Sequence, residues 1–193
     1  MSSKGKILEN ILQAQMNATS LADVKIPVSS AVDTTAEFIS VIEKIGGKAV
    51  EVRNWSFIVE YISEHYSPLN RVISTLSALP WFVHHLSDNP HSFEDVDLAI
   101  LEGHFGVAEN GAVWITDTLM GDRSIPFIAQ HLALVINKKD IVPTLHEAYE
   151  KIESLPYDFG TFIAGPSKTA DIEQSLVLGA HGPKSMIVFL LGE

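Results

Sequence analysis

Residues 48–74 read KAVEVRNWSFIVEYISEHYSPLNRVIS, and the pattern of apolar residues along them indicates the fold class. Residues 48–52 alternate in the manner of a strand, residues 57–65 carry apolar side chains at helical spacing, and residues 71–74 form a second apolar strand. Two strands joined through a helix imply a crossover connection and parallel pairing. The sequence therefore predicts an α/β protein with a Rossmann-like, mainly parallel sheet that carries helices on both faces.

The segments on either side extend this alternation. A helix is expected at about residues 4–18, and a second between the cap residues at 33–35 and the glycines at 46–47. Asn110-Gly111 predicts a hairpin turn between strands at 106–108 and 112–116. Further strands are expected at residues 98–101, 132–136, 161–164 and 186–191, and further helices from Pro143, as first helical residue, to about 152 and from about 169 to 178.

Composition limits the classes of protein that fit. The 193 residues, with 46% hydrophobic side chains and no low-complexity stretch, favour a single domain over 1–193, with an N-terminal portion to about residue 96 and a motif-bearing portion from 97. A net charge of −11 disfavours nucleic acid as a ligand. No apolar run approaches the ~20 residues that cross a bilayer, and the N-terminus lacks the pattern of a secretory signal, so a cytoplasmic protein without membrane association is expected.

The absence of cysteine restricts redox chemistry. Without thiolates the chain can hold neither a disulfide nor a cysteine-ligated zinc ion or iron–sulfur cluster of its own. One-electron chemistry would therefore depend on a partner. Glu109, His131, Asp171 and His181 are possible metal ligands, but their spacing matches no metal motif, and no metal is assigned.

Residues 165–173, GPSKTADIE, are the most informative candidate for binding. They are expected to join the carboxyl end of a strand to a helix N-terminus, where α/β proteins bind ligands and where free N–H groups favour anions. An ordinary capped helix would show the same residues. The candidate binding residues here are Gly165, Ser167, Lys168, Thr169, Asp171 and Glu173.

Two further segments offer polar side chains. Glu109 closes a short apolar strand, where partial desolvation would suit a general base or nucleophile, although a solvated residue flanking the turn fits equally. Asn110 and Gly111 accompany it as candidate binding residues. His181 and Lys184 flank a rigid Gly-Pro turn and could orient a substrate.

The chain from residue 97 onward resembles the LUD-domain family, and more closely its lactate utilization protein C branch. The resemblance rests on four segments in the family's order and spacing, here called the motif segments: AENG (108–111), IVPTL (141–145), GPSKTADIE (165–173) and GAHGPK (179–184). Lys168 stands where the family usually has arginine, so a point charge replaces a forked donor. The family is similar in fold to the sugar-phosphate isomerase and CoA-transferase group, whose ligands lie over the carboxyl edge of the sheet.

This resemblance implies participation in the oxidation of L-lactate to pyruvate. The chain would be the cluster-free subunit, binding a small anionic substrate while iron–sulfur partner proteins carry the electrons. Two alternatives remain open: an independent transferase or ligase for small molecules that uses Glu109, and a non-catalytic assembly subunit. Under each of these hypotheses, residues 165–169 are expected to bend over the carboxyl edge of the sheet, close to Glu109 and His181.

Overall fold

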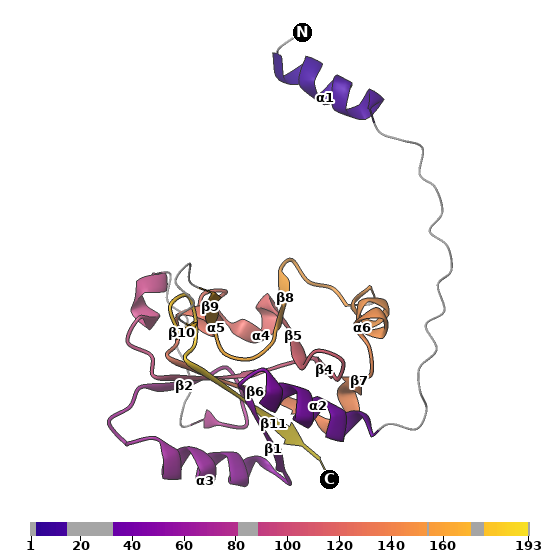
Figure 1. Ribbon diagram of the computed structural model, residues 1–193. Helices are drawn as coiled ribbons and strands as arrows, with labels where there is room; N and C mark the ends of the chain where they lie inside the picture. The colour runs from indigo at the N-terminus through magenta and orange to yellow at the C-terminus, as the bar shows by residue number, and fades with distance from the viewer. Residues whose placement is uncertain (1–2, 15–32, 81–88, 154, 171–175, 193) are drawn as a thin grey trace.

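A five-stranded parallel sheet forms the centre of the protein in the computed structural model, which describes residues 3–14, 33–80, 89–153, 155–170 and 176–192 (Figure 1). Its strand order is β1-β11-β6-β3-β2, and every neighbouring pair is parallel. The strands are β1 (Lys48–Val52), β2 (Val72–Ser74), β3 (Leu98–Glu102), β6 (His131–Asn137) and β11 (Ser185–Leu191). The predicted α/β class and parallel pairing are confirmed.

Helices cover both faces of this main sheet, as expected. α3 (Trp55–His65) lies on one face, and α2 (Thr34–Lys44), α4 (Asp117–Met120) and α5 (Ile125–Ile128) pack on the other (Figure 1). Side-chain caps fix the starts of the two long helices: Asp33 accepts from two N–H groups of α2, and Asn54 does the same for α3. The cap at Asn54 explains why α3 begins two residues before its predicted start.

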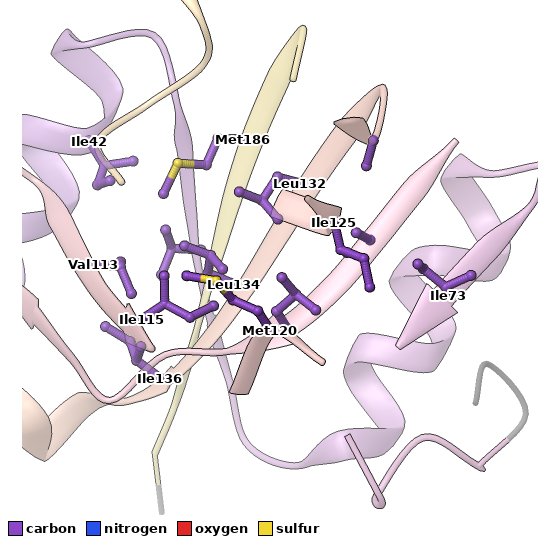
Figure 2. Close-up of a cluster of buried hydrophobic side chains, with 14 of the residues drawn as sticks. Ile42, Ile73, Val113, Ile115, Met120, Ile125, Leu132, Leu134, Ile136 and Met186 are labelled. Atoms are coloured by element: carbon purple, nitrogen blue, oxygen red, sulfur yellow. The ribbon is translucent and has the colours of Figure 1, made fainter. Parts of the chain in front are cut away.

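Strand β6 shows why both faces of the sheet must be covered. Leu132, Leu134 and Ile136 point into the core on the α2 side, which Figure 2 shows, whereas Ala133 and Val135 join the core on the α3 side. A strand buried on both faces reads as a continuous apolar run, and parallel sheets have this property. The same alternation runs along β11.

A second, four-stranded sheet packs on the α2 side and was not predicted as a separate unit. Its order is β7-β4-β5-β8, and Val113 and Ile115 of β5 reach into the shared core (Figure 2). Helix α6 (Leu145–Ile152) packs on its outer side against Phe105 and Trp114. The strands are β4 (Phe105–Val107), β5 (Ala112–Thr116), β7 (Ile141–Val142) and β8 (Gly160–Ile163).

Two local predictions are wrong. The helix expected at about residues 169–178 is replaced by strands β9 (Lys168–Ala170) and β10 (Leu176–Leu178), which pair antiparallel. Pro143 is not the first residue of a helix, because α6 begins at Leu145 and its N-cap is Thr144, whose hydroxyl accepts from the Glu147 N–H. The hairpin at residues 109–111 is confirmed, although its loop is longer than a two-residue turn and is closed by the Gly111 N–H donating to the Val107 carbonyl.

Within the described ranges, the remaining elements are a helix and two short 3-10 turns. α1 (Ser3–Gln13) contains no buried residue, and its Ile7, Leu8, Ile11 and Leu12 side chains are exposed. The 3-10 turns are η2 (Pro90–Phe93) and η3 (Lys138–Asp140). Across the described ranges, no helix combines the length and apolar character needed to cross a membrane.

Replacing Leu134 by alanine should test the importance of the two-sided core. Leu134 is fully buried, so the cavity should lower the free energy of unfolding by about 2–5 kcal/mol. Leu69→Ala is the matched control, because Leu69 is 95% exposed and should change stability by less than about 0.5 kcal/mol. Urea unfolding measures both, and equal midpoints for the two variants would contradict a core buried on both faces of the sheet.

Candidate functional site

The carboxyl end of α2 brings two motif segments together. Gly111 and Gly165 both have positive φ, 66° and 71°, where L side chains are strained. A Cβ at Gly111 would lie 3.2 Å from the Ile42 nitrogen, and one at Gly165 would lie 3.0 Å from the Ile45 carbonyl oxygen. The antiparallel register of β5 and β8, continued outward, places these two glycines opposite each other. Both segments therefore need glycine to approach the same turn of α2.

The segment that begins at Gly165 also contacts the last motif segment. The Ser167 N–H donates to the Pro183 carbonyl (2.9 Å), and the Gly179 N–H donates to the Ser167 carbonyl (3.0 Å). Gly182 faces Ser167 so closely that a Cβ there would lie 3.2 Å from the serine Cβ. Backbone hydrogen bonds thus join residues 165–169 to residues 179–184.

The first two motif segments are joined in the same manner. The Ala108 N–H donates to the Val142 carbonyl (2.9 Å), and the Glu109 N–H donates to the Pro143 carbonyl (3.0 Å). The Glu109 carboxylate then accepts from the Leu145 N–H, at 2.7 Å, in the first turn of α6. All four motif segments therefore form one continuous set of contacts.

Two of the segments, residues 165–169 and 179–184, lie at the amino edge of the main sheet, the edge where its parallel strands begin, so the carboxyl edge expected for residues 165–169 is wrong. Gly46 and Gly47 immediately precede β1, Pro183 and Lys184 precede β11, and the Lys184 N–H donates to the Gln130 carbonyl, just before β6. The expectation failed because β8, which leads into residues 165–169, belongs to the second sheet. The rule for strand ends in the main sheet does not apply to it.

The basis for an anion site at residues 165–169 also changes. The N-terminus of a helix was expected to follow Lys168, but β9 begins there instead. The Lys168 side chain lies beside Gly46, where a Cβ would be 3.3 Å from its Nζ. That position is at the carboxyl end of α2, the negative end of its dipole, which favours a cation. Any attraction for anions therefore comes from the lysine itself and not from a helix.

Glu109 does not occupy a desolvated position. The residue is exposed, and its Oε2 is the acceptor for the first N–H of α6. Asn110 is committed to the turn, because its Oδ1 accepts from the Ala112 N–H at 3.0 Å. Both side chains therefore stabilise the local backbone by accepting hydrogen bonds from it. Glu109 acts as a cap for a helix that is distant in sequence.

The other expected site residues divide into two groups. Lys168, His181 and Lys184 are exposed, Ser167 is half-buried, and Thr169 lies within β9. Asp171 and Glu173 lie outside the described residues, and so does their proposed contact with Glu109. Among the residues that the structure describes, no three His, Asp or Glu side chains gather as a metal site would require.

Sequence reasoning missed a series of hydrogen-bonded polar side chains at the carboxyl edge of the main sheet. His104, which follows β3, lies with Nε2 2.8 Å from the Thr116 hydroxyl, and Thr116 in turn contacts the Thr118 hydroxyl at 2.8 Å. Thr116 is almost fully buried at the end of β5. Burial lowers the pKa of His104, and the nearby Lys151 lowers it further. No spacing in the sequence signals this contact, because it depends on the pairing of β4 with β5.

Thr118 borders an open cavity of about 440 Å³. Asp117 and Arg123 form an ion pair there at 2.7 Å, and the Arg123 hydrogen bond is the main cause of a lowered pKa for Asp117. The pair satisfies both charges within the protein. Asp122 lies beside it and accepts from the Ser124 N–H and hydroxyl.

Comparison with known proteins identifies the class. The sequence model of the LUD domain matches residues 78–191, which is more than half of the chain, so the protein belongs to the LUD domain family.

Individual relatives refine this assignment. The chain is 32% identical over 97 residues to lactate utilization protein C of Halalkalibacterium halodurans (47% of this chain, 42% of that protein). It is 34% identical over 94 residues to lactate utilization protein C 1 of Bacillus mycoides (45% and 40%). It is also 25% identical over 128 residues to YkgG of Escherichia coli K12 (63% and 55%). These matches span about half the length of the relatives.

A solved structure supports the fold. The crystal structure of a DUF162 family protein from Deinococcus radiodurans aligns with a TM-score of 0.58, covering 86% of this chain and all of that one. The sequence identity is 17%, so this likeness concerns the fold alone.

The cap formed by Glu109 can be tested by two substitutions. Glu109→Ala removes the acceptor of the Leu145 N–H and should lower the free energy of unfolding by about 0.5–2 kcal/mol, the usual effect of losing a cap. Glu109→Gln keeps an acceptor oxygen and should retain most of that stability. Amide exchange at Leu145 should accelerate in the alanine variant alone. Glu64→Ala, at an exposed position of α3, is the control, and identical behaviour of all three variants would contradict the capping role.

The lowered pKa of His104 predicts a dependence of stability on pH. The unfolded chain takes up a proton near the ordinary value of 6.5, whereas the folded chain does so only at lower pH. Stability is therefore fully present above pH 6.5 and falls as the pH drops toward the folded-state pKa. His104→Gln retains a hydrogen-bonding side chain without this titration, so its free energy of unfolding should decline less between pH 7 and pH 5. Parallel pH profiles for the two proteins would rule this out.

Proposed function

We propose that this chain is a component of a lactate-oxidising system, in which it is the cluster-free subunit and works with iron–sulfur partner proteins. The observation that carries the proposal is the continuous contact among all four motif segments, two of which lie at the amino edge of the sheet. Segments so far apart in sequence are held together by backbone hydrogen bonds and close glycine contacts. The names of the similar proteins from Halalkalibacterium and Bacillus supply the link to lactate.

The chemistry of the exposed groups suits a small anionic substrate such as L-lactate. Lys168 and Lys184 provide positive charge, and Ser167 and His181 provide hydrogen-bonding groups in the adjoining segments. The chain contains no cysteine, so electrons from lactate would pass to cysteine-bearing partners. Its own contribution is to bind or present the substrate.

The position of Glu109 favours a second candidate, an assembly subunit that does not itself catalyse. Its carboxylate is engaged with the first N–H of α6 and exposed to solvent. A base or nucleophile is usually freed for the substrate and shielded from water, so the transferase alternative receives less support from this geometry. In the assembly role, the same segments would contact partner proteins.

Reconstitution of the system tests the proposal. The chain should co-purify with iron–sulfur proteins, and L-lactate should drive reduction of an electron acceptor only when this chain is present. At low salt, Lys168→Ala should raise KM for lactate about fivefold, corresponding to roughly 1 kcal/mol from an exposed charge, whereas Lys168→Arg should retain affinity. Lys139→Ala, which removes an exposed lysine after β6 at the opposite edge, is the matched control.

The outcomes separate the two candidates. An unchanged KM in Lys168→Ala, with activity still dependent on the chain, would favour the assembly subunit. Full lactate oxidation without the chain would overturn both.

A further inference from the structure

A second group of polar side chains lies on the α3 side of the amino edge. His131, the first residue of β6, has Nδ1 2.7 Å from the Ser185 hydroxyl, at the start of β11. The ring of Tyr66, which caps the end of α3, stands edge-on to His131 with centroids 5.9 Å apart. The proposed lactate site leaves His131, Ser185 and Tyr66 without a role.

A cavity of about 380 Å³ opens beside this group, within the range of small-molecule sites. Tyr66 is part of its wall. The apolar lining comes from α3 and the chain that follows it, with Ser63, Ser67 and Asn70 as polar groups. The apolar wall residues are Val59, Ile62, Pro68 and Val72.

The register of the sheet connects the cavity to the histidine. Val72, Leu98, His131 and Ser185 are aligned on four successive strands, and Leu98 belongs to the core on the α3 side. Neighbouring strands lie about 4.8 Å apart, so Val72 in the cavity wall and His131 are separated by roughly 10 Å along one row. Buried Leu98 fills the row between them, so the cavity reaches the histidine through the Tyr66 ring, which lines the cavity and contacts His131.

Lys184 and Asp97 are the charged groups that act on His131. Burial lowers the pKa of His131, Lys184 lowers it further, and Asp97 partly opposes them. Tyr66 and Tyr61 lie on the same side, and burial raises the pKa of Tyr66. His65 stacks on the Tyr61 ring, and the Lys48 ammonium donates to the Tyr61 hydroxyl. Asp97 is already engaged, because its carboxylate accepts from the Arg71 N–H at 2.7 Å. A bound carboxylate would favour the protonated form of His131 and would lie within the field of Lys184.

We infer that His131, Ser185 and Tyr66 form a binding site for a small aliphatic monocarboxylate. Its carboxylate contacts His131 and Ser185 within the field of Lys184, and its hydrocarbon tail enters the cavity beside Tyr66. The inference does not depend on lactate being the substrate at the motif segments.

Acetate, butyrate and hexanoate are the probes. Their binding to the intact chain is measured by NMR of the His131 ring. Affinity should rise about fourfold for each methylene added, the usual effect of burying one CH₂ group. The pKa of His131 should rise when hexanoate is bound, because the anion favours the protonated ring. Equal affinity for the three acids, or an unmoved pKa at saturation, would overturn the inference.

Variants assign the contacts. His131→Gln and Ser185→Ala should each weaken hexanoate binding, the former at least about tenfold through loss of a charge-assisted hydrogen bond. His146→Gln, at an exposed position on α6, should bind hexanoate as the unaltered protein does. Circular dichroism confirms folding, and Ser185→Ala provides a smaller change if His131→Gln fails to fold. Undiminished binding in a folded Ser185→Ala or His131→Gln variant would overturn the site.

Discussion

β6 and β11 pair in parallel from Ser185 against His131 to Leu191 against Asn137, and their side chains are buried alternately on two sides. Because the register is fixed by both cores at once, a slip of one residue would exchange the apolar sets of the two faces. The starting points of both strands are consequently fixed, and so are the segments that lead into them. The positions of Gln130, Pro183 and Lys184 at the amino edge follow from this constraint.

Two of the motif segments are held at that fixed edge, and the other two contact them through α2 and the second sheet. Residues 179–184 enter β11 and hold Ser167 by backbone hydrogen bonds, while Ile45 at the end of α2 contacts the glycines of two other segments. Few of these contacts involve side chains that would identify a chemistry. The backbone contacts determine where the exposed lysines and His181 lie. A binding role for those groups therefore depends on a rigid backbone.

The sequence was most informative where one local pattern determined the structure. The strand at 48–52, the helix ending at 65 and the hairpin around Asn110-Gly111 depend on periodicity, caps and turn residues, and all three are confirmed. The segment after Lys168 misled because a threonine followed by acidic residues is typical of a helix start. Pairing of β9 with β10 prevailed there, which illustrates how tertiary and cross-strand contacts override local propensity.

The edge of the sheet was misjudged for a related reason, since membership of β8 in the second sheet depends on its pairing with β5. The partner of Glu109 could not be foreseen either, because Leu145 reaches it only through β7.

The insertion of β11 between β1 and β6 has a consequence for how the protein folds. Lys48 of β1 pairs with Ile187, and among the described strands β1 has β11 as its partner. Until β11 arrives, β1 has no neighbour with which to form a ladder, and the cores on both sides of the sheet stay open. Such non-local pairing slows folding and leaves apolar surface exposed in the meantime. During synthesis, completion of the sheet must therefore await release of residues 185–191 from the ribosome, so the nascent chain is most vulnerable to aggregation while nearly all of its core side chains have already been made.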